Sequence, residues 1–157
     1  LALQARRVNE HMPSYVAQKM DLFLREKGKD KGSKLFIVGF AFKGRPETSD
    51  MRDSPTLDLV SELKKFGYTN VCGYDPVVPK SEVEQLGVSF EEVENGFTNA
   101  DAVIIMNNHI SYAKFDIYAL LEKMNKPSIF FDGWHLFPPD DIMSVEGVSL
   151  SGLGYVR

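Results

Sequence analysis

Cysteine is nearly absent from this sequence, which contains only Cys72. A single thiol excludes an internal disulfide framework and a cysteine-rich metal site, and it is typical of a protein of the reducing cytoplasm. Long hydrophobic runs are also missing, because no apolar stretch approaches the roughly 20 residues that span a bilayer. Positive charge is not in excess either. The formal net charge is -4, so the composition gives no reason to expect nucleic acid or an anionic membrane as a partner.

The first residues lack both an initiator methionine and the apolar stretch of a signal peptide. We therefore expect the chain to be an excised piece of a longer protein. Its 157 residues, 43% of them hydrophobic and 25% charged, are typical of one globular domain with a sizeable core.

Hydrophobic periodicity predicts the order of helices and strands. Residues 3–27 have apolar positions at three- and four-residue steps, which favours a helix. Pro13 falls inside this run, and an interior proline removes a hydrogen bond, so we expect two helices that meet near Met12 and Pro13. Continuous apolar runs predict strands at 35–39, 71–74, 88–90, 102–106, 128–132 and 148–150, and helices are expected at 55–66, 80–85 and 115–124.

Strands and helices alternate from residue 35 onward, and the strands are of the fully buried type. This pattern predicts an α/β fold: a Rossmann-like three-layer α/β/α arrangement with a mostly parallel sheet, preceded by an N-terminal helix. Such sheets bind ligands at the carboxyl ends of their strands. The loops after Gly39, Tyr74, Met106 and Asp132 are therefore the expected site.

The loop after the first strand lacks a dinucleotide fingerprint. In G-x-G-x-x-G the glycines let the backbone approach a pyrophosphate. Here Gly39 is present, but Ala41 occupies the second glycine position and the third falls at Lys43-Gly44. We therefore expect no autonomous NAD site in this chain.

The same loop and several later motifs resemble the C-terminal domain of the UDP-glucose/GDP-mannose dehydrogenase family. That domain has Gly-x-Ala-Phe-Lys after a strand, then Asp-x-Arg-x-Ser-Pro, and a second strand that ends in Tyr-Asp-Pro. The matching residues are Gly39, Ala41, Phe42 and Lys43, then Asp50, Arg52, Ser54 and Pro55, and finally Tyr74, Asp75 and Pro76. Residues 101–105 and 131–133 also fit. The resemblance assigns 1–28 to the end of the family's central dimerisation helix, and 34–157 to the nucleotide-sugar-binding domain.

The resemblance implies one part of an enzyme. Members of the family are NAD-dependent UDP-sugar 6-dehydrogenases, which oxidise the sugar C6 hydroxyl to a carboxylate for polysaccharide precursor synthesis. An N-terminal domain binds NAD, and a catalytic cysteine lies near the central helix. Both are outside this chain, so the resemblance implies a domain that is inactive alone, that binds a UDP-sugar and that forms a homodimer in the full-length protein.

Site residues follow from the matched motifs. Phe42 and Lys43 correspond to the family's substrate contacts, where an ammonium holds a pyrophosphate or sugar oxygen and an aromatic ring walls the pocket. Arg52 corresponds to an arginine that reaches the NAD bound by the other domain. The alternative for Arg52 is a surface ion pair with Asp50 or Asp53. Arg45 lies in a stretch longer than the common family loop, and no role transfers to it.

Three further residues, Trp134, Cys72 and His109, have more than one possible role. Trp134 stands where many members have an arginine shortly after the strand, and it could stack on a base or sugar or pack on the sheet end. Cys72 lies inside a strand without a basic neighbour, so we interpret it as a buried, inert thiol. His109 is interpreted as a loop histidine, although 107–109 could touch ligand. The histidines have no metal-ligand spacing, and no metal is expected.

Two other classes of function remain open. A nucleotide- or CoA-binding regulatory module would show the same alternation of strands and helices. A structural oligomerisation domain would use helix 3–27 as its main surface. A panel of nucleotide ligands and a measurement of oligomeric state would separate these alternatives.

Overall fold

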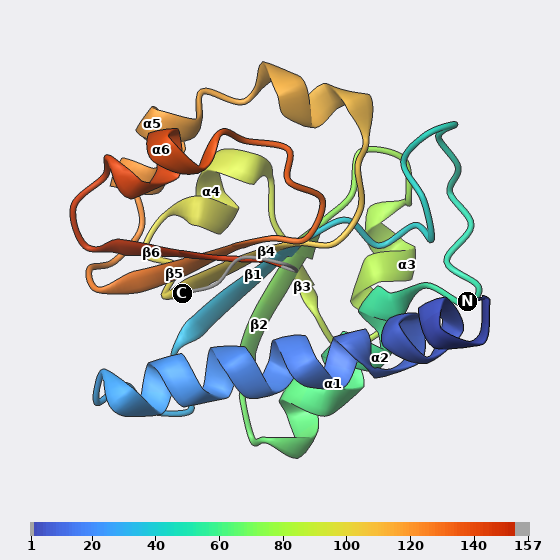
Figure 1. Cartoon of the computed structure of the whole chain (residues 1–157), viewed down its shortest axis with the longest axis horizontal. Coiled ribbons are helices and arrows are strands. Elements are labelled where there is room, and N and C mark those ends of the chain that lie inside the picture. The colour runs from blue at the N-terminus through green and yellow to red at the C-terminus, as the bar shows by residue number, and fades with distance from the viewer. Residues whose placement is uncertain (1, 153–157) are drawn as a thin grey trace.

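The computed structural model describes residues 2–152, with side chains from residue 11 onward (Figure 1). The strands are β1 (Lys34–Val38), β2 (Asn70–Tyr74), β3 (Ser89–Phe90), β4 (Ala102–Ile105), β5 (Ser128–Asp132) and β6 (Val148–Ser151). The helices are α1 (Ala2–Glu26), α2 (Pro55–Lys65), α3 (Lys80–Glu84), α4 (Val93–Phe97), α5 (Ile117–Glu122), α6 (Pro139–Met143) and the 3-10 helix η1 (Ile110–Lys114).

The strands form one six-stranded sheet in the order β3-β2-β1-β4-β5-β6. Every pairing is parallel, and Ile37 of β1 lies opposite Gly73 of β2 on one side and Ile104 of β4 on the other. The order reverses between β1 and β4, which is where doubly wound sheets bind ligands. The predicted α/β fold class with a parallel sheet is confirmed.

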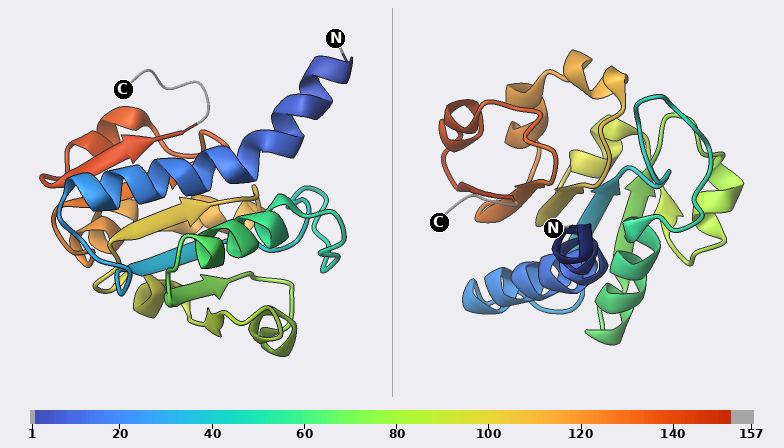
Figure 2. Two further views of the ribbon diagram at one scale, coloured as in Figure 1. Left: turned by 90° about the horizontal axis from the view of Figure 1, so that it is seen from below. Right: turned by 45° about the vertical axis from the view of Figure 1, so that its right-hand side comes forward.

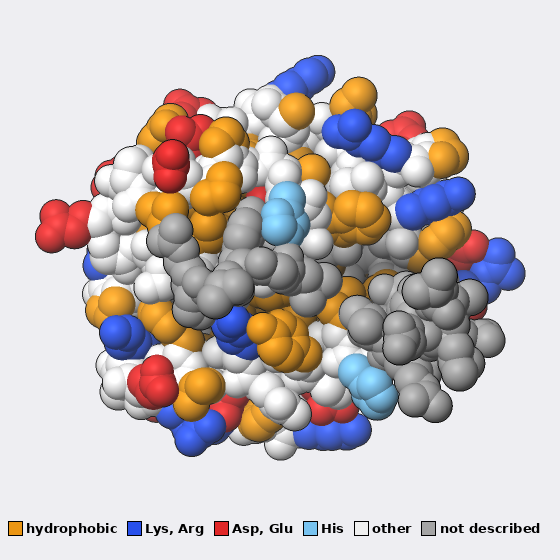
Figure 3. Space-filling model, in the orientation of Figure 1, with side chains coloured by type: hydrophobic (Ala, Val, Ile, Leu, Met, Phe, Trp, Pro, Cys, Tyr) orange, Lys and Arg blue, Asp and Glu red, His pale blue; other side chains and the backbone are white. Residues whose placement is uncertain are grey.

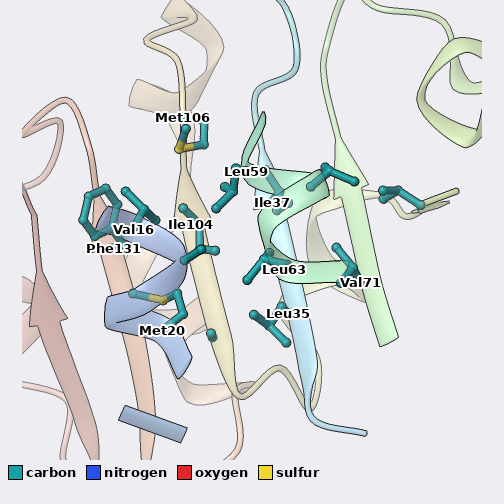
Figure 4. Packing of buried hydrophobic residues seen from close by; sticks show 14 of the residues in the cluster. Val16, Met20, Leu35, Ile37, Leu59, Leu63, Val71, Ile104, Met106 and Phe131 are labelled. Atoms are coloured by element: carbon teal, nitrogen blue, oxygen red, sulfur yellow. The ribbon is translucent and has the colours of Figure 1, made fainter. Parts of the chain in front are cut away.

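One face of the sheet is covered by α1, α2 and α3, as Figure 4 shows in part. Leu35 and Ile37 of β1 point to this face, because alternate side chains of a strand point to opposite sides. They pack with Leu59 and Leu63 of α2 and with Met20 of α1, all fully buried. The opposite face is covered by α4, α5 and α6, which enclose residues such as Phe36 and Val38. The predicted three layers are therefore present.

The N-terminal helix differs from the prediction. Two helices meeting near Met12 and Pro13 were expected, but α1 is continuous and contains Pro13. Figure 2 shows that the N-terminal part of α1 turns away from the axis of the remainder. A bend of this kind absorbs the proline clash without ending the helix. Beyond Pro13, the fully buried Val16 and Met20 hold α1 on the sheet.

A buried carboxylate also fixes α1 to the domain. Asp21, 3% exposed, accepts hydrogen bonds from Arg25 Nε (2.8 Å), Lys31 Nζ (2.7 Å) and Tyr68 Oη (2.8 Å). Burial alone would raise the pKa of Asp21, but the hydrogen bonds from Lys31, Tyr68 and Arg25 outweigh it and lower that pKa below 3.8. The helix and the loop before β1 are therefore joined electrostatically as well as by apolar packing.

The ends of the other elements follow local sequence signals. At the start of α2, Ser54 Oγ accepts a hydrogen bond from Thr56 N (3.3 Å), and Pro55 occupies the first turn. Gly67, with φ +97°, follows the C-cap and stops the helix as expected. The predicted strands are confirmed to within a residue or two, whereas α4, α6 and η1 were not predicted.

The surface is mixed in character. Figure 3 shows hydrophobic, basic and acidic side chains interspersed over the face that carries α1. Among residues 2–152, no helix combines the length and the apolar character needed to cross a bilayer.

Candidate functional site

The loops that follow β1 and β4 meet closely at the carboxyl edge of the sheet. Gly39 adopts φ +107°, and a Cβ at this position would lie 2.6 Å from Asn107 Cγ. Only glycine permits both this backbone conformation and this approach. Gly39 thus allows the loops after β1 and β4 to lie in contact. Its carbonyl accepts a hydrogen bond from Thr56 Oγ1 (2.7 Å) in the first turn of α2.

Asp75, at the end of β2, organises this edge. It is 4% exposed, and its Oδ2 accepts hydrogen bonds from the backbone N–H groups of Phe40 (2.7 Å) and Ala41 (3.0 Å). Its Oδ1 accepts from the N–H groups of Val77 (2.8 Å) and Val78 (2.9 Å). The carboxylate therefore fixes the loop after β1 and its own loop in one arrangement.

Asn107 extends the network to the end of β4. Its Nδ2 donates to Asp75 Oδ2 (3.3 Å) and to the Ala41 carbonyl (3.2 Å), and its Oδ1 accepts from Tyr112 Oη (2.6 Å). Tyr112 is fully buried, and burial raises the pKa of its hydroxyl. Three loops are consequently held rigidly at the point where the strand order reverses.

These contacts occupy the place where a Rossmann sheet binds a dinucleotide. An acidic residue after the second strand ordinarily binds the ribose of NAD, but here Asp75 already accepts five hydrogen bonds from the protein. The ring of Phe40 is fully buried, and a Cβ at Gly73 would collide with it. The residues present therefore do not fit an NAD site within this domain.

Phe42 and Lys43 lie together on the loop after β1. Lys43 Nζ is 5.2 Å from the centroid of the Phe42 ring, and Phe42 is 40% exposed. The Phe42 N–H donates to the Asp50 carbonyl (2.9 Å), which closes the loop at its base. The structure thus places an ammonium group over an aromatic ring at the carboxyl edge.

Arg52 lies on the same loop and pairs with Asp50. Its Nη2 is 2.7 Å from Asp50 Oδ2 and its Nε is 3.0 Å from Oδ1, while its side chain is 88% exposed. The hydrogen bond from the Arg52 side chain lowers the pKa of Asp50 to about 2. This geometry matches the surface ion pair that the sequence left open as one alternative for Arg52. An exposed pair of this type contributes little to stability.

Trp134 lies two strands away from Phe42, after β5. Asp132 is fully buried and accepts hydrogen bonds from Trp134 N (3.2 Å) and Phe137 N (3.0 Å). The indole Nε1 donates to the Met106 carbonyl at the end of β4 (3.1 Å), and the side chain is 46% exposed. Trp134 is thus held at the sheet edge with part of its surface open to solvent.

Other residues singled out in the sequence have clear environments. Cys72 is 3% exposed, and burial raises the pKa of its thiol to about 11, as an inert thiol requires. Within residues 11–152, no group of three or more potential ligands could hold a metal ion. His109 is buried rather than solvated, and its Nε2 bonds to Glu47 Oε2. Sequence reasoning missed this pair because 62 residues separate the partners.

Comparison with known families matches residues 36–139 to the UDP binding domain of the UDP-glucose/GDP-mannose dehydrogenase family. Among curated proteins, a UDP-N-acetyl-D-mannosamine dehydrogenase from Pyrococcus horikoshii is 33% identical over 139 residues, covering 86% of this chain and 30% of that protein. The UDP-glucose 6-dehydrogenase TuaD from Bacillus subtilis is 27% identical over 128 residues, covering 80% and 27%. The chain spans about a third or less of the length of these relatives.

Solved structures give the same result. The UDP-D-ManNAc dehydrogenase from Pyrococcus horikoshii superimposes with a TM-score of 0.74 at 25% identity, covering 96% of this chain and 32% of that one. An NDP-N-acetyl-D-galactosaminuronic acid dehydrogenase from Methanosarcina mazei shares the fold, with a TM-score of 0.76 at 24% identity and coverage of 97% and 31%. The resemblance noted in the sequence is confirmed, and this chain belongs to the UDP-glucose/GDP-mannose dehydrogenase family, of which it carries the UDP binding domain.

Proposed function

We propose that this chain is the substrate-binding C-terminal domain of an NAD-dependent UDP-sugar 6-dehydrogenase. In this proposal the whole enzyme oxidises the C6 hydroxyl of the sugar to a carboxylate, and this domain holds the nucleotide part of the substrate. The observation that carries the proposal is the Phe42–Lys43 pair, with Lys43 Nζ 5.2 Å from the ring centroid, at the edge where parallel sheets bind ligands.

The chemistry of the pair suits a nucleoside diphosphate. A lysine ammonium holds a diphosphate as a point charge, and an exposed ring offers an apolar wall for a base or sugar. The Asp75 network supports this role, because it fixes the backbone of Phe40 and Ala41 directly before the pair. A pocket that is rigid before binding loses less entropy when the ligand enters.

The same network also supports the proposal that a second domain, and not this one, binds NAD. Since Asp75 and Phe40 fill the dinucleotide position here, NAD would be held by another part of the full-length enzyme. Arg52 would then leave Asp50 and reach across the cleft to that NAD, which its 88% exposure permits. Helix α1 would belong to the central region that forms a homodimer, and the isolated chain would have no dehydrogenase activity.

The test is a thermal-shift panel on this chain with UDP, UDP-glucose, UDP-N-acetylhexosamines, GDP-mannose, CoA and NAD. A ligand that binds only the folded state raises the melting temperature by mass action, so even weak affinity is detected at high concentration. The proposal predicts shifts with the uridine nucleotides and none with CoA or NAD. A shift with CoA or NAD alone would identify a regulatory module instead.

A further inference from the structure

The loop that carries Phe42 and Lys43 is closed against the end of β4 by three polar contacts. Gly44 N donates to Asn108 Oδ1 (3.2 Å), and Arg45 Nε donates to the Asn108 carbonyl (3.0 Å). At the tip of the loop, Glu47 Oε2 bonds to His109 Nε2. Gly44 packs so closely that a Cβ there would collide with the backbone of Asn108 and His109. These contacts lie directly beside the proposed substrate residues.

The Glu47–His109 bond is unlike an ordinary surface ion pair. The His109 side chain is 9% exposed, whereas that of Glu47 is 64% exposed. His109 caps η1, because its Nδ1 accepts a hydrogen bond from Ser111 N (3.1 Å). A carboxylate oxygen accepts, so His109 donates this hydrogen bond to Glu47 from Nε2. A fixed, buried donor thus faces a carboxylate at the end of a solvent-exposed loop.

We propose that Glu47 and His109 are positioning residues, which latch loop 42–50 onto the end of β4 and so preorganise Lys43 for the diphosphate. This inference rests on the proposed function and adds to it a specific contact that holds the substrate-binding loop in place. In the free protein the latch keeps the loop in the binding-competent arrangement. Loss of the latch reduces the competent fraction, and the apparent affinity falls by the same factor.

Removal of Glu47 should change UDP affinity in opposite directions according to whether Glu47 is only a nearby charge or holds the loop. If Glu47 were only a surface charge near the site, its removal would leave the binding of an anionic diphosphate unchanged or strengthen it. If Glu47 is a latch, Glu47→Ala weakens UDP binding by about three- to tenfold, the range expected for one hydrogen bond. Glu47→Gln removes the charge but keeps an acceptor for His109, so it retains wild-type affinity or exceeds it. Glu146→Ala, an exposed glutamate just before β6, is the matched control.

The experiment combines calorimetric titration of UDP with amide hydrogen exchange at Gly44 in the ligand-free chain. The latch predicts that Glu47→Ala weakens affinity and speeds Gly44 exchange at least about threefold, while Glu47→Gln and Glu146→Ala neither weaken affinity nor speed that exchange. Affinity in Glu47→Ala equal to or tighter than wild type overturns the proposal, as does unchanged Gly44 exchange. Failure of the wild-type chain to bind UDP would instead refute the proposed function, and Gly44 exchange would still decide whether Glu47 holds the loop.

Discussion

Asn107 Nδ2 lies 3.3 Å from Asp75 Oδ2, and this hydrogen bond joins the ends of β4 and β2 across the intervening strand β1. The two residues come from strands that are not neighbours in the sheet. Their contact is possible because Gly39 leaves room for the Asn107 side chain. The arrangement replaces a ribose-binding acid with an internal support for the loop that carries Phe42 and Lys43.

Asp75→Asn should lower the free energy of unfolding by about 3 kcal/mol, because an amide offers one acceptor oxygen where the carboxylate serves backbone donors on both oxygens. Urea unfolding followed by circular dichroism measures the change. Glu84→Gln, on the exposed side of α3, is the control and should stay within about 0.5 kcal/mol of wild type. Equal stability of Asp75→Asn and wild type would contradict the role of Asp75.

Trp134 provides a spectroscopic reporter, because it is the one tryptophan of the chain. The sequence offers Trp134 as a residue that could stack on a base or sugar of the substrate, and the residue is 46% exposed. Saturating UDP or a UDP-sugar should therefore change the intensity or wavelength of intrinsic fluorescence. Binding detected by calorimetry without any change in emission would mean that Trp134 only packs on the sheet edge.

Cys72 should resist thiol reagents in the folded protein. Burial raises its pKa to about 11, so almost none of the reactive thiolate is present near neutral pH. Reaction with a chromogenic disulfide should be slow in buffer and complete in concentrated urea. Rapid labelling of the native chain would show that the thiol is accessible and would reopen a chemical role for it.

Asp21 should contribute to stability in a defined pH range. Its pKa is below 3.8 in the folded state, so its stabilising effect is complete above the unfolded value and is lost as pH falls through the lowered folded value. The free energy of unfolding should therefore decrease as pH falls below about 4, and less steeply in Asp21→Asn than in wild type. Urea titrations at several pH values test this. Identical slopes would contradict the stabilising network around Asp21.

Sequence patterns predicted the sheet well because its strands are continuous apolar runs. Residues 102–106 are all buried, as expected for a strand that is covered on both faces of the sheet. The five-residue helices α4 and α6 are too short to show a helical period and were not predicted, although α3, of the same length, was. At Pro13 the sequence rule failed, since tertiary packing of α1 tolerates a bend that an isolated helix would avoid.

The site was less predictable than the fold. Phe42 and Lys43 were predicted because they fall in a contiguous motif, and the structure places Lys43 Nζ 5.2 Å from the centroid of the Phe42 ring. Their contact with the substrate stays a prediction. The supporting residues are joined only by folding: Asp75 meets Phe40 N over 35 residues, and Glu47 meets His109 over 62. Contacts between residues so far apart in the chain leave no recognisable pattern in the local sequence. The Tyr-Asp-Pro motif pointed to Asp75 as a family feature but not to its function as a support for the loops.

The measurement that tests the central claim most directly is calorimetric titration of UDP into the wild-type chain and Lys43→Ala, with Lys123→Ala as the matched control. Lys123 is exposed and follows α5, away from the loop after β1. If Lys43 holds the diphosphate, Lys43→Ala should bind UDP about tenfold or more weakly than wild type, the loss expected for a charged hydrogen bond. Lys123→Ala should match wild type. Equal UDP affinity in Lys43→Ala and wild type would contradict the assignment of the Phe42–Lys43 pair as the nucleotide-sugar site.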